Sequence, residues 1–141
     1  MTFIDYILGG CEINFHLAID FTASNGDPKF GTSLHYMGNN FKNQYTDAMK
    51  SVLNVLKDYD SDQQFPVYGF GGKIPGAGVS HCFALNGNIF DPEVKGPDEV
   101  MKVYQNYVKK GTLWGPTNFA SIVSHVNSFC KHSEQEISQR N

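Results

Sequence analysis

The chain lacks an excess of positive charge. Its 141 residues carry 11 lysines and arginines against 14 aspartates and glutamates, for a net charge of −3, and no block of basic residues interrupts this balance. Proteins that bind nucleic acids depend on positive charge to neutralise phosphates. A nucleic-acid partner is therefore disfavoured.

Cysteines are few and widely spaced. Cys11, Cys82 and Cys130 are odd in number and form no Cys-x-x-Cys pair. This spacing indicates neither a disulfide framework nor a zinc site built on thiolates. A reducing, cytoplasmic location fits the pattern best.

Long hydrophobic runs are also missing. No run reaches the length that spans a bilayer. The segment 1–8 contains Asp5 and lacks the basic flank and long apolar core of a secretory signal. We therefore expect a chain that is neither secreted nor inserted in a membrane by itself. A composition of 40% hydrophobic and 18% charged residues fits one globular domain with a single core.

Two kinds of hydrophobic periodicity alternate along the sequence. Short apolar runs bounded by glycine, asparagine and aspartate predict strands. Apolar residues that recur at intervals of three and four predict amphipathic helices. The predicted elements are a strand over 13–19, a helix over 45–59, strands over 65–70 and 81–85, a helix over 96–110 and a helix that begins after residue 118.

This order of elements is typical of an α/β fold, in which helices lie on a sheet. The strands over 65–70 and 81–85 are close enough in sequence to form a hairpin. We expect one domain over residues 1–132, followed by a polar, disordered tail over 133–141.

Three side chains with oxygen atoms follow the first predicted strand, in the pattern Asp20-x-Thr22-x-Ser24. Alternation along an extended chain directs these side chains to one side. Ligands that are all oxygen suit a hard divalent cation such as Mg²⁺ or Mn²⁺. The alternative is local: aspartate, serine and threonine often bond the backbone of a turn or cap a helix.

A further hydroxyl lies on a second loop, at Thr117 in the segment Gly115-Pro116-Thr117-Asn118. It is a candidate fourth ligand, and its alternative role is to cap the helix that follows, a position in which threonine and asparagine are preferred. The strand-end motif together with this threonine resembles the metal-ion-dependent adhesion site of von Willebrand factor A domains.

The resemblance is closer to the A domain of copines and covers nearly the whole chain up to about residue 125. It is carried by many short segments that occur in the same order. These segments are 3–7, 13–15, 18–28, 33–36, 59–62, 65–66, 69–71, 79–81, 85–87 and 115–119.

The resemblance implies a doubly wound, mostly parallel sheet with flanking helices, and a cation held by loops at the carboxyl ends of strands. It implies that Thr22, Ser24 and Thr117 supply hydroxyl ligands and that Asp20 supplies a carboxylate, directly or through water. The ion would be Mg²⁺, Mn²⁺ or Ca²⁺. The function implied is non-enzymatic recruitment of intracellular proteins through an acidic group bound to the metal.

Copines bind phospholipids in response to calcium through two N-terminal domains, and this sequence contains neither. Association with membranes is therefore expected only as part of a full-length copine.

The sequence departs from the copine pattern at its end. Copine A domains continue after the third helix into an apolar strand and an Asp-Gly loop that adds an acidic group to the site, and this chain has a polar segment there. The resemblance thus predicts an A domain that is incomplete in its C-terminal half, with weak metal binding because affinity falls with ligand charge. It also predicts an open edge beside the first strand, through which copies of the chain could associate.

Two other functions remain open from the sequence. One is a metal-free or inactive truncated fragment, which the missing Asp-Gly loop favours. The other, less favoured, is a hydrolase in which Asp20 acts as nucleophile or base, because such sites usually place a second aspartate where this chain has Thr22.

Overall fold

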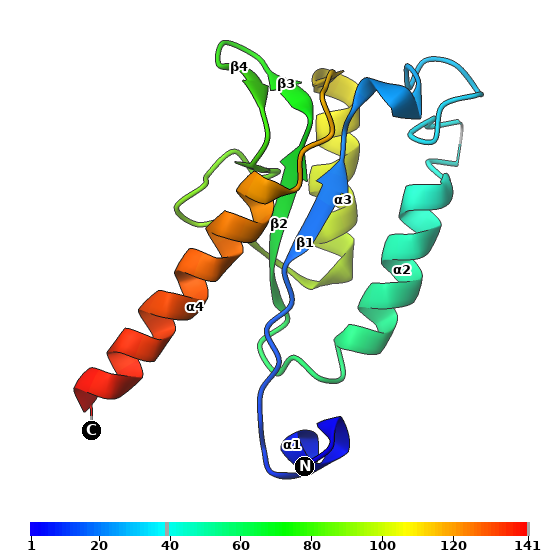
Figure 1. Ribbon diagram of the computed structural model, residues 1–141. Coiled ribbons are helices and arrows are strands. Elements are labelled where there is room, and N and C mark those ends of the chain that lie inside the picture. Colours follow the sequence, from blue (N-terminus) through cyan, green and yellow to red (C-terminus); the bar gives the residue numbers. More distant parts are fainter. Residues whose placement is uncertain (39, 141) are drawn as a thin grey trace.

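The computed structural model describes residues 1–38 and 40–140 and has a mixed α/β architecture (Figure 1). Helices lie on both faces of a small sheet. The elements in chain order are α1 (Phe3–Leu8), β1 (Leu17–Asp20), the 3₁₀ turn η1 (Ala23–Asn25), α2 (Gln44–Leu56), β2 (Gln64–Phe70), β3 (Gly72–Ile74), β4 (Gly78–Ser80), β5 (Phe83–Ala84), β6 (Glu93–Lys95), α3 (Gly96–Lys110), β7 (Thr112–Leu113) and α4 (Ala120–Arg140).

The main sheet has the order β1-β2-β5, and β6 pairs with the first half of β2. Strands β1 and β2 are parallel, with Leu17 opposite Val67 and Asp20 opposite Phe70. Their connection runs through α2, which gives the chain the length it needs to return to the same end of the sheet. A second sheet has the order β4-β3-β7.

The expected mostly parallel sheet is not observed. Among the described strands only β1 and β2 run parallel, whereas β5 and β6 pair with β2 in the antiparallel direction and both pairings of the second sheet are antiparallel. The physical reason is the short connections after β2, which carry no crossover helix and so reverse the chain. The antiparallel pairing implied by the predicted hairpin is observed, since Tyr68 lies opposite Ala84, but β3 and β4 lie between β2 and β5 in the chain, so these two strands are not joined by a simple turn.

Alternate residues of β2 face opposite sides of the sheet. Phe65 and Val67 belong to the main core together with α2 and α3, whereas Tyr68 and Phe70 pack with Ile122 of α4 on the other face. This burial on both faces explains why β2 is a continuous apolar run in the sequence. The buried residues of the main core are Ile19, Phe21, Met49, Leu53, Phe65, Val67, Phe83, Val94, Val100, Met101, Tyr104 and Val108.

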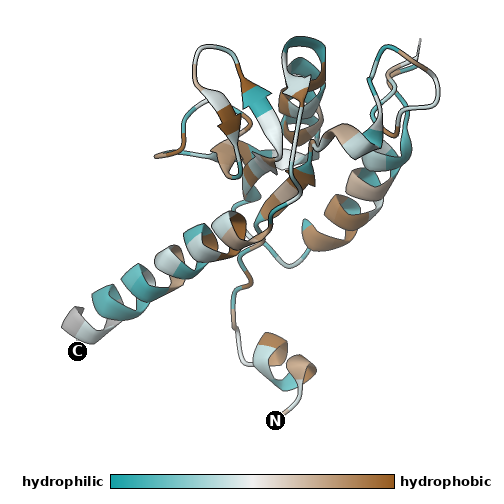
Figure 2. Ribbon diagram, turned by 45° about the horizontal axis from the view of Figure 1, so that its top comes forward, coloured by the Kyte–Doolittle hydropathy of each residue, from teal (hydrophilic) through white to brown (hydrophobic). Residues whose placement is uncertain are grey.

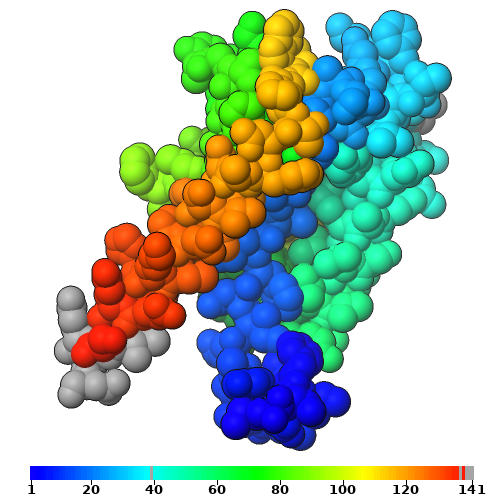
Figure 3. Space-filling model, in the orientation of Figure 1, coloured from blue at the N-terminus to red at the C-terminus, as the bar shows by residue number. Residues whose placement is uncertain are grey.

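Helix α4 continues through residues 133–140, whereas the sequence analysis predicted a disordered tail over 133–141. Residue 141 lies outside the described residues. Residues after 132 carry no apolar stripe, so hydrophobic periodicity could not reveal this part of the helix. Glutamate, glutamine and arginine are nonetheless good helix formers. Figure 2 shows the distal half of α4 as mainly hydrophilic, and Figure 3 shows it projecting from the body of the molecule.

The six-residue helix α1 was not predicted. Thr2 and Asp5 form a capping box at its start, in which each side chain bonds the backbone of the other residue. None of its residues is buried. Among the described helices, none has the length and hydropathy that crossing a membrane requires.

Candidate metal centre

The loop with the predicted ligands begins where β1 ends, at the carboxyl end of the parallel pair. Phe21 extends the pairing by donating its N–H to the carbonyl of Phe70 at 2.9 Å. The chain then turns through η1, so the side chains after β1 are held close to the sheet. This is the edge at which open α/β sheets bind ligands.

The structure brings three predicted ligands together. Oδ1 of Asp20 accepts hydrogen bonds from the Thr22 amide at 2.8 Å and from the Thr22 hydroxyl at 2.6 Å. The Ser24 hydroxyl lies 3.1 Å from the Thr22 hydroxyl. Thr22 is buried and Ser24 is exposed, so the cluster opens to the surface at Ser24. These bonds are also the local turn contacts that were the alternative explanation of the motif.

The buried side chain of Asn25 holds the loop after β1 against α2. Its Nδ2 donates to the carbonyl of Thr22 at 3.0 Å, and its Oδ1 accepts from the Tyr45 hydroxyl of α2 at 2.8 Å. The side chain is only 7% exposed. The sequence analysis missed this role because an asparagine before a glycine is also a common turn residue.

Gly71 makes room for the loop. It has a φ of +72°, which side-chain-bearing residues rarely adopt, and a Cβ here would collide with the Cγ2 methyl group of Thr22. A glycine directly after β2 therefore permits the close approach of the two loops.

Thr117 lies on a segment that starts beside the loop but is not joined to the cluster. The amide of Ala23 donates to the carbonyl of Trp114, which places the start of this segment against η1. The Thr117 side chain is exposed, and the hydrogen bonds of the described residues include none from it to the cluster. Oδ1 of Asn118 accepts from the Ala120 amide at 2.9 Å, so the cap of α4 is provided by Asn118.

A buried histidine, His35, forms a hydrogen bond with the last residue of β1. His35 is fully buried, and its Nε2 lies 2.7 Å from the carbonyl oxygen of Asp20. A carbonyl can only accept, so Nε2 carries the proton and Nδ1 accepts from the Tyr104 hydroxyl at 2.8 Å. That hydroxyl accepts in turn from Nδ2 of Asn43 at 3.0 Å. This buried network joins β1 to α3 and to the start of α2.

The sequence model of the copine family matches residues 33–140, which is well over half of the chain. The chain belongs to the copine family. The resemblance identified from the sequence is thus confirmed at the level of the family. The match includes Thr117 and begins after the Asp20–Ser24 segment, so the roles of individual ligands rest on the geometry of the site.

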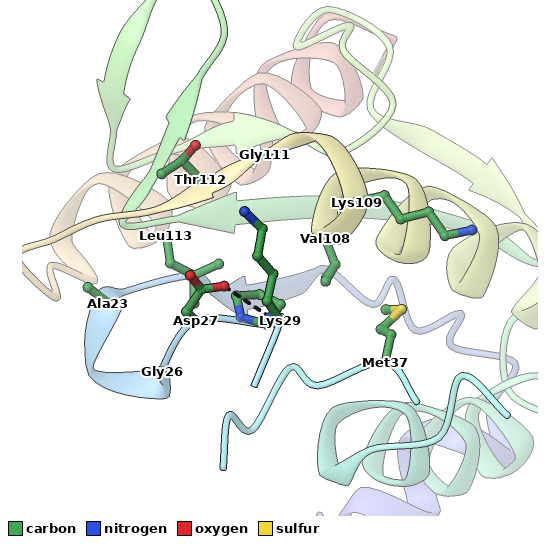
Figure 4. A pocket seen from close by; sticks show the side chains of 11 residues that line it. Ala23, Gly26, Asp27, Lys29, Met37, Val108, Lys109, Gly111, Thr112 and Leu113 are labelled. Atoms are coloured by element: carbon green, nitrogen blue, oxygen red, sulfur yellow. Dashed lines mark hydrogen bonds between the residues drawn. The ribbon is translucent and has the colours of Figure 1, made fainter. Parts of the chain in front are cut away.

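A cavity of about 560 Å³ adjoins the loop of this copine-family chain at Ala23 (Figure 4). Its walls include the apolar side chains of Met37, Val108 and Leu113. In Figure 4 the Lys29 side chain extends across the cavity, whereas Lys109 points away from it. The cavity therefore has space for a small ligand group beside Ala23, with the ammonium group of Lys29 able to reach it.

The oxygen atoms of Asp20, Thr22 and Ser24 fit a hard divalent cation, and one carboxylate among them favours only weak binding of such an ion. Every candidate ligand offers oxygen, which Mg²⁺, Mn²⁺ and Ca²⁺ prefer. Within residues 1–38 and 40–140 no three or more histidine, cysteine, aspartate or glutamate residues are grouped so that they could hold a metal ion. Asp20 is the one carboxylate among the hydrogen-bonded residues Asp20, Thr22, Ser24 and Asn25. A single negative charge offsets only part of a divalent charge.

Two histidines, the buried His35 and the partly buried His16, should make stability dependent on pH. Burial lowers the pKa of His35, and burial followed by the nearby His125 lowers the pKa of His16. Below the ordinary value of 6.5 the unfolded chain therefore binds protons that the folded chain does not. We expect the free energy of unfolding to be highest above pH 6.5 and to fall as the pH drops toward the folded-state pKa values.

Urea unfolding at pH 7.5 and pH 5.5 measures this effect. Burial raises the pKa values of Asp60 and Glu93, so protonation of these two carboxylates stabilises the folded state as the pH falls. This opposing effect grows at more acidic pH, where carboxylates take up protons. Stopping at pH 5.5 limits that opposing contribution. A urea midpoint that is equal or higher at pH 5.5 would contradict the prediction.

Proposed function

We propose that this copine-family chain is a non-enzymatic protein-binding module with a divalent-cation site of the adhesion type. Asp20, Thr22 and Ser24 hold the ion, and Thr117 completes the site when the second loop closes on it. The observation that carries the proposal is the convergence of one carboxylate and two hydroxyls, linked by contacts of 2.6 and 3.1 Å, at the end of a parallel strand pair.

The residues of the site have different roles in binding the ion. The Asp20 carboxylate supplies the negative charge, while Asn25 and His35 hold the loop in place through the carbonyls of Thr22 and Asp20. The ion, when bound, offers an open position to an acidic group of a partner. We propose Mg²⁺ or Mn²⁺, with Ca²⁺ as a further candidate, and weak binding because only one carboxylate is present.

The partner is an intracellular protein that presents an aspartate or glutamate. The partner residues next to this aspartate or glutamate would lie in the cavity beside Ala23, where Lys29 contributes a positive charge. The fold is a doubly wound arrangement of the von Willebrand factor A type, which helices on both faces of the sheet and the β1-α2-β2 crossover support. We place the module in the cytoplasm, with membrane association through the lipid-binding domains of copines.

Replacement of Asp20 by asparagine tests the proposal. Asparagine keeps the shape of the side chain and an oxygen that can accept from Thr22, but it removes the charge. We expect Mg²⁺ and Mn²⁺ to bind at least tenfold more weakly, a loss of about 1.4 kcal/mol. The measurement is a metal titration followed by amide NMR, with local shifts at Ser24 and Thr117 expected in the unchanged chain.

Asp27→Asn is the matched control. Asp27 is exposed, and its Oδ1 accepts from the amide of Lys29, two residues on, as Asp20 does from Thr22. This variant should bind metal as the unchanged chain does. Equal losses in both variants, or no amide shifts at Ser24 in the unchanged chain, would contradict the metal site.

A metal-free binding module is the second candidate. It is favoured by the bonds from Thr22 and Asn25 that already occupy Oδ1 of Asp20. It predicts that partner binding is unchanged by a chelator, whereas the metal-dependent module loses binding.

A further inference from the structure

The cavity of about 560 Å³ beside Ala23 is lined by two side chains of opposite charge that belong to one loop. Asp27 and Lys29 are both exposed. They do not pair with each other, since the ion pairs found within residues 1–38 and 40–140 involve neither side chain. Oδ1 of Asp27 accepts a hydrogen bond from the Lys29 amide, and Oδ2 has no partner among the described residues. Both charged groups can therefore bind a ligand that enters the cavity.

The loop that carries these two charges is held in place by its own hydrogen bonds. Oδ1 of Asp27 accepts from the Lys29 amide at 3.0 Å (Figure 4), and the Asp27 carbonyl accepts from the Phe30 amide at 3.0 Å. The Gly26 carbonyl accepts from the Ser33 hydroxyl at 2.8 Å. The loop is therefore ordered without a ligand, as in most sites for small molecules, which are largely formed before the ligand binds.

The floor of the cavity is apolar and continuous with the main core. Val108 belongs to that core, and the half-buried Met37 and Leu113 pack against it. These three side chains all line the cavity. Its volume lies within the range of about 300–1,000 Å³ that is typical of sites for small molecules. An apolar group of a ligand would thus be removed from water by contact with side chains that are already fixed by packing.

A second lysine lines the cavity but is directed elsewhere. The Lys109 ammonium lies 4.6 Å from the centre of the Phe41 ring, and Figure 4 shows its side chain pointing away from the cavity. Lys29 instead extends across the cavity. Of the charged residues in the lining, Asp27 and Lys29 thus remain to bind a ligand, and their charges cancel. A ligand that carries both a positive and a negative group is therefore favoured over a simple anion or cation.

We propose that this cavity binds a free α-amino acid with a large apolar side chain. Lys29 binds its carboxylate, Asp27 binds its ammonium group, and its side chain covers Met37, Val108 and Leu113. Because Asp27 and Lys29 are two residues apart in one turn, they suit an ammonium and a carboxylate carried by the same carbon atom. The site does not require the metal ion, although the amino acid would occupy space that is open to the residues of a metal-bound partner.

The test is a titration of the full chain with L-leucine, followed by NMR after divalent ions have been removed by dialysis. We expect shifts at the Gly111 amide and at the methyl groups of Val108 and Leu113. Glycine should bind at least tenfold more weakly, because it has no side chain to bury on the apolar floor. Two further probes separate the charges: isocaproate lacks the ammonium group of leucine, and isopentylamine lacks its carboxylate.

Variants at the two charges should each affect a different probe. Lys29→Gln should weaken the binding of L-leucine and isocaproate about three- to fivefold, the loss expected for an exposed ion pair, and leave isopentylamine unchanged. Asp27→Asn should weaken L-leucine and isopentylamine by a similar factor and leave isocaproate unchanged. Asparagine keeps an oxygen that can accept from the Lys29 amide, so the loop is preserved.

Lys109→Gln is the matched control, because this side chain points away from the cavity, and it should leave the binding of all three probes unchanged. Equal weakening of L-leucine by Lys29→Gln and Lys109→Gln would overturn the proposal, as would equal binding of glycine and L-leucine. The absence of shifts at Gly111 and Leu113 on addition of L-leucine would also overturn it. Since divalent ions are removed, none of these outcomes bears on the metal site.

Discussion

Replacement of Phe21 by alanine is expected to lower the free energy of unfolding by about 3–5 kcal/mol. Phe21 is fully buried, and its ring lies 4.2 Å from that of Tyr107 and 5.1 Å from that of His35, between ring centroids. It also packs against Phe83 and Tyr104. Removing the ring leaves a cavity between the sheet and α3. Since domains are commonly stable by about 5–15 kcal/mol, this variant should keep little stability.

Urea unfolding followed by circular dichroism measures the loss. Phe90→Ala is the matched control, because Phe90 is 95% exposed and its replacement should change the free energy of unfolding by less than about 0.5 kcal/mol. A loss below about 1 kcal/mol for Phe21→Ala would show that this residue, at the end of β1, does not hold the core together.

Local patterns predicted the elements of the fold better than their pairing. The apolar stripe over 96–110 corresponds to α3, and the run over 65–70 corresponds to β2. Strand β6 and its antiparallel pairing with β2 were not predicted, because the partner of a strand can be distant in sequence. Helix α1 was missed because it buries none of its residues, so hydrophobic burial leaves no pattern there.

In the candidate site too, the residues close in sequence were predicted and the contacts between distant residues were not. Spacing along an extended chain was enough to place Asp20, Thr22 and Ser24 on one side, and the structure brings their oxygens together. The residues that hold the end of β1 in place could not be predicted from spacing along the sequence. His35 and Tyr104 are 69 residues apart and meet only through the packing of α3 on the sheet, so no local periodicity relates them.

Tyr104→Phe is expected to lower the free energy of unfolding by about 2–3 kcal/mol, although it removes a single oxygen atom. The ring remains and the core volume is kept, so no large cavity forms. The loss arises because Nδ1 of His35 and Nδ2 of Asn43 both lose their partner. His35 is fully buried and cannot bond water instead, whereas Asn43 is partly exposed and can. Most of the cost therefore comes from the histidine.

Tyr107→Phe on the same helix separates this cause from a general effect of removing a hydroxyl. The Tyr107 hydroxyl makes one long contact, 3.4 Å to the carbonyl of Lys73, so its loss should cost less than about 0.5 kcal/mol. In Tyr104→Phe, NMR of the imidazole should also show a changed environment at Nδ1 of His35, while Nε2 stays bonded to Asp20. Equal losses in the two variants, or an unchanged Nδ1 signal, would mean that the end of β1 is held to α3 by apolar packing alone, without the hydrogen bonds of His35.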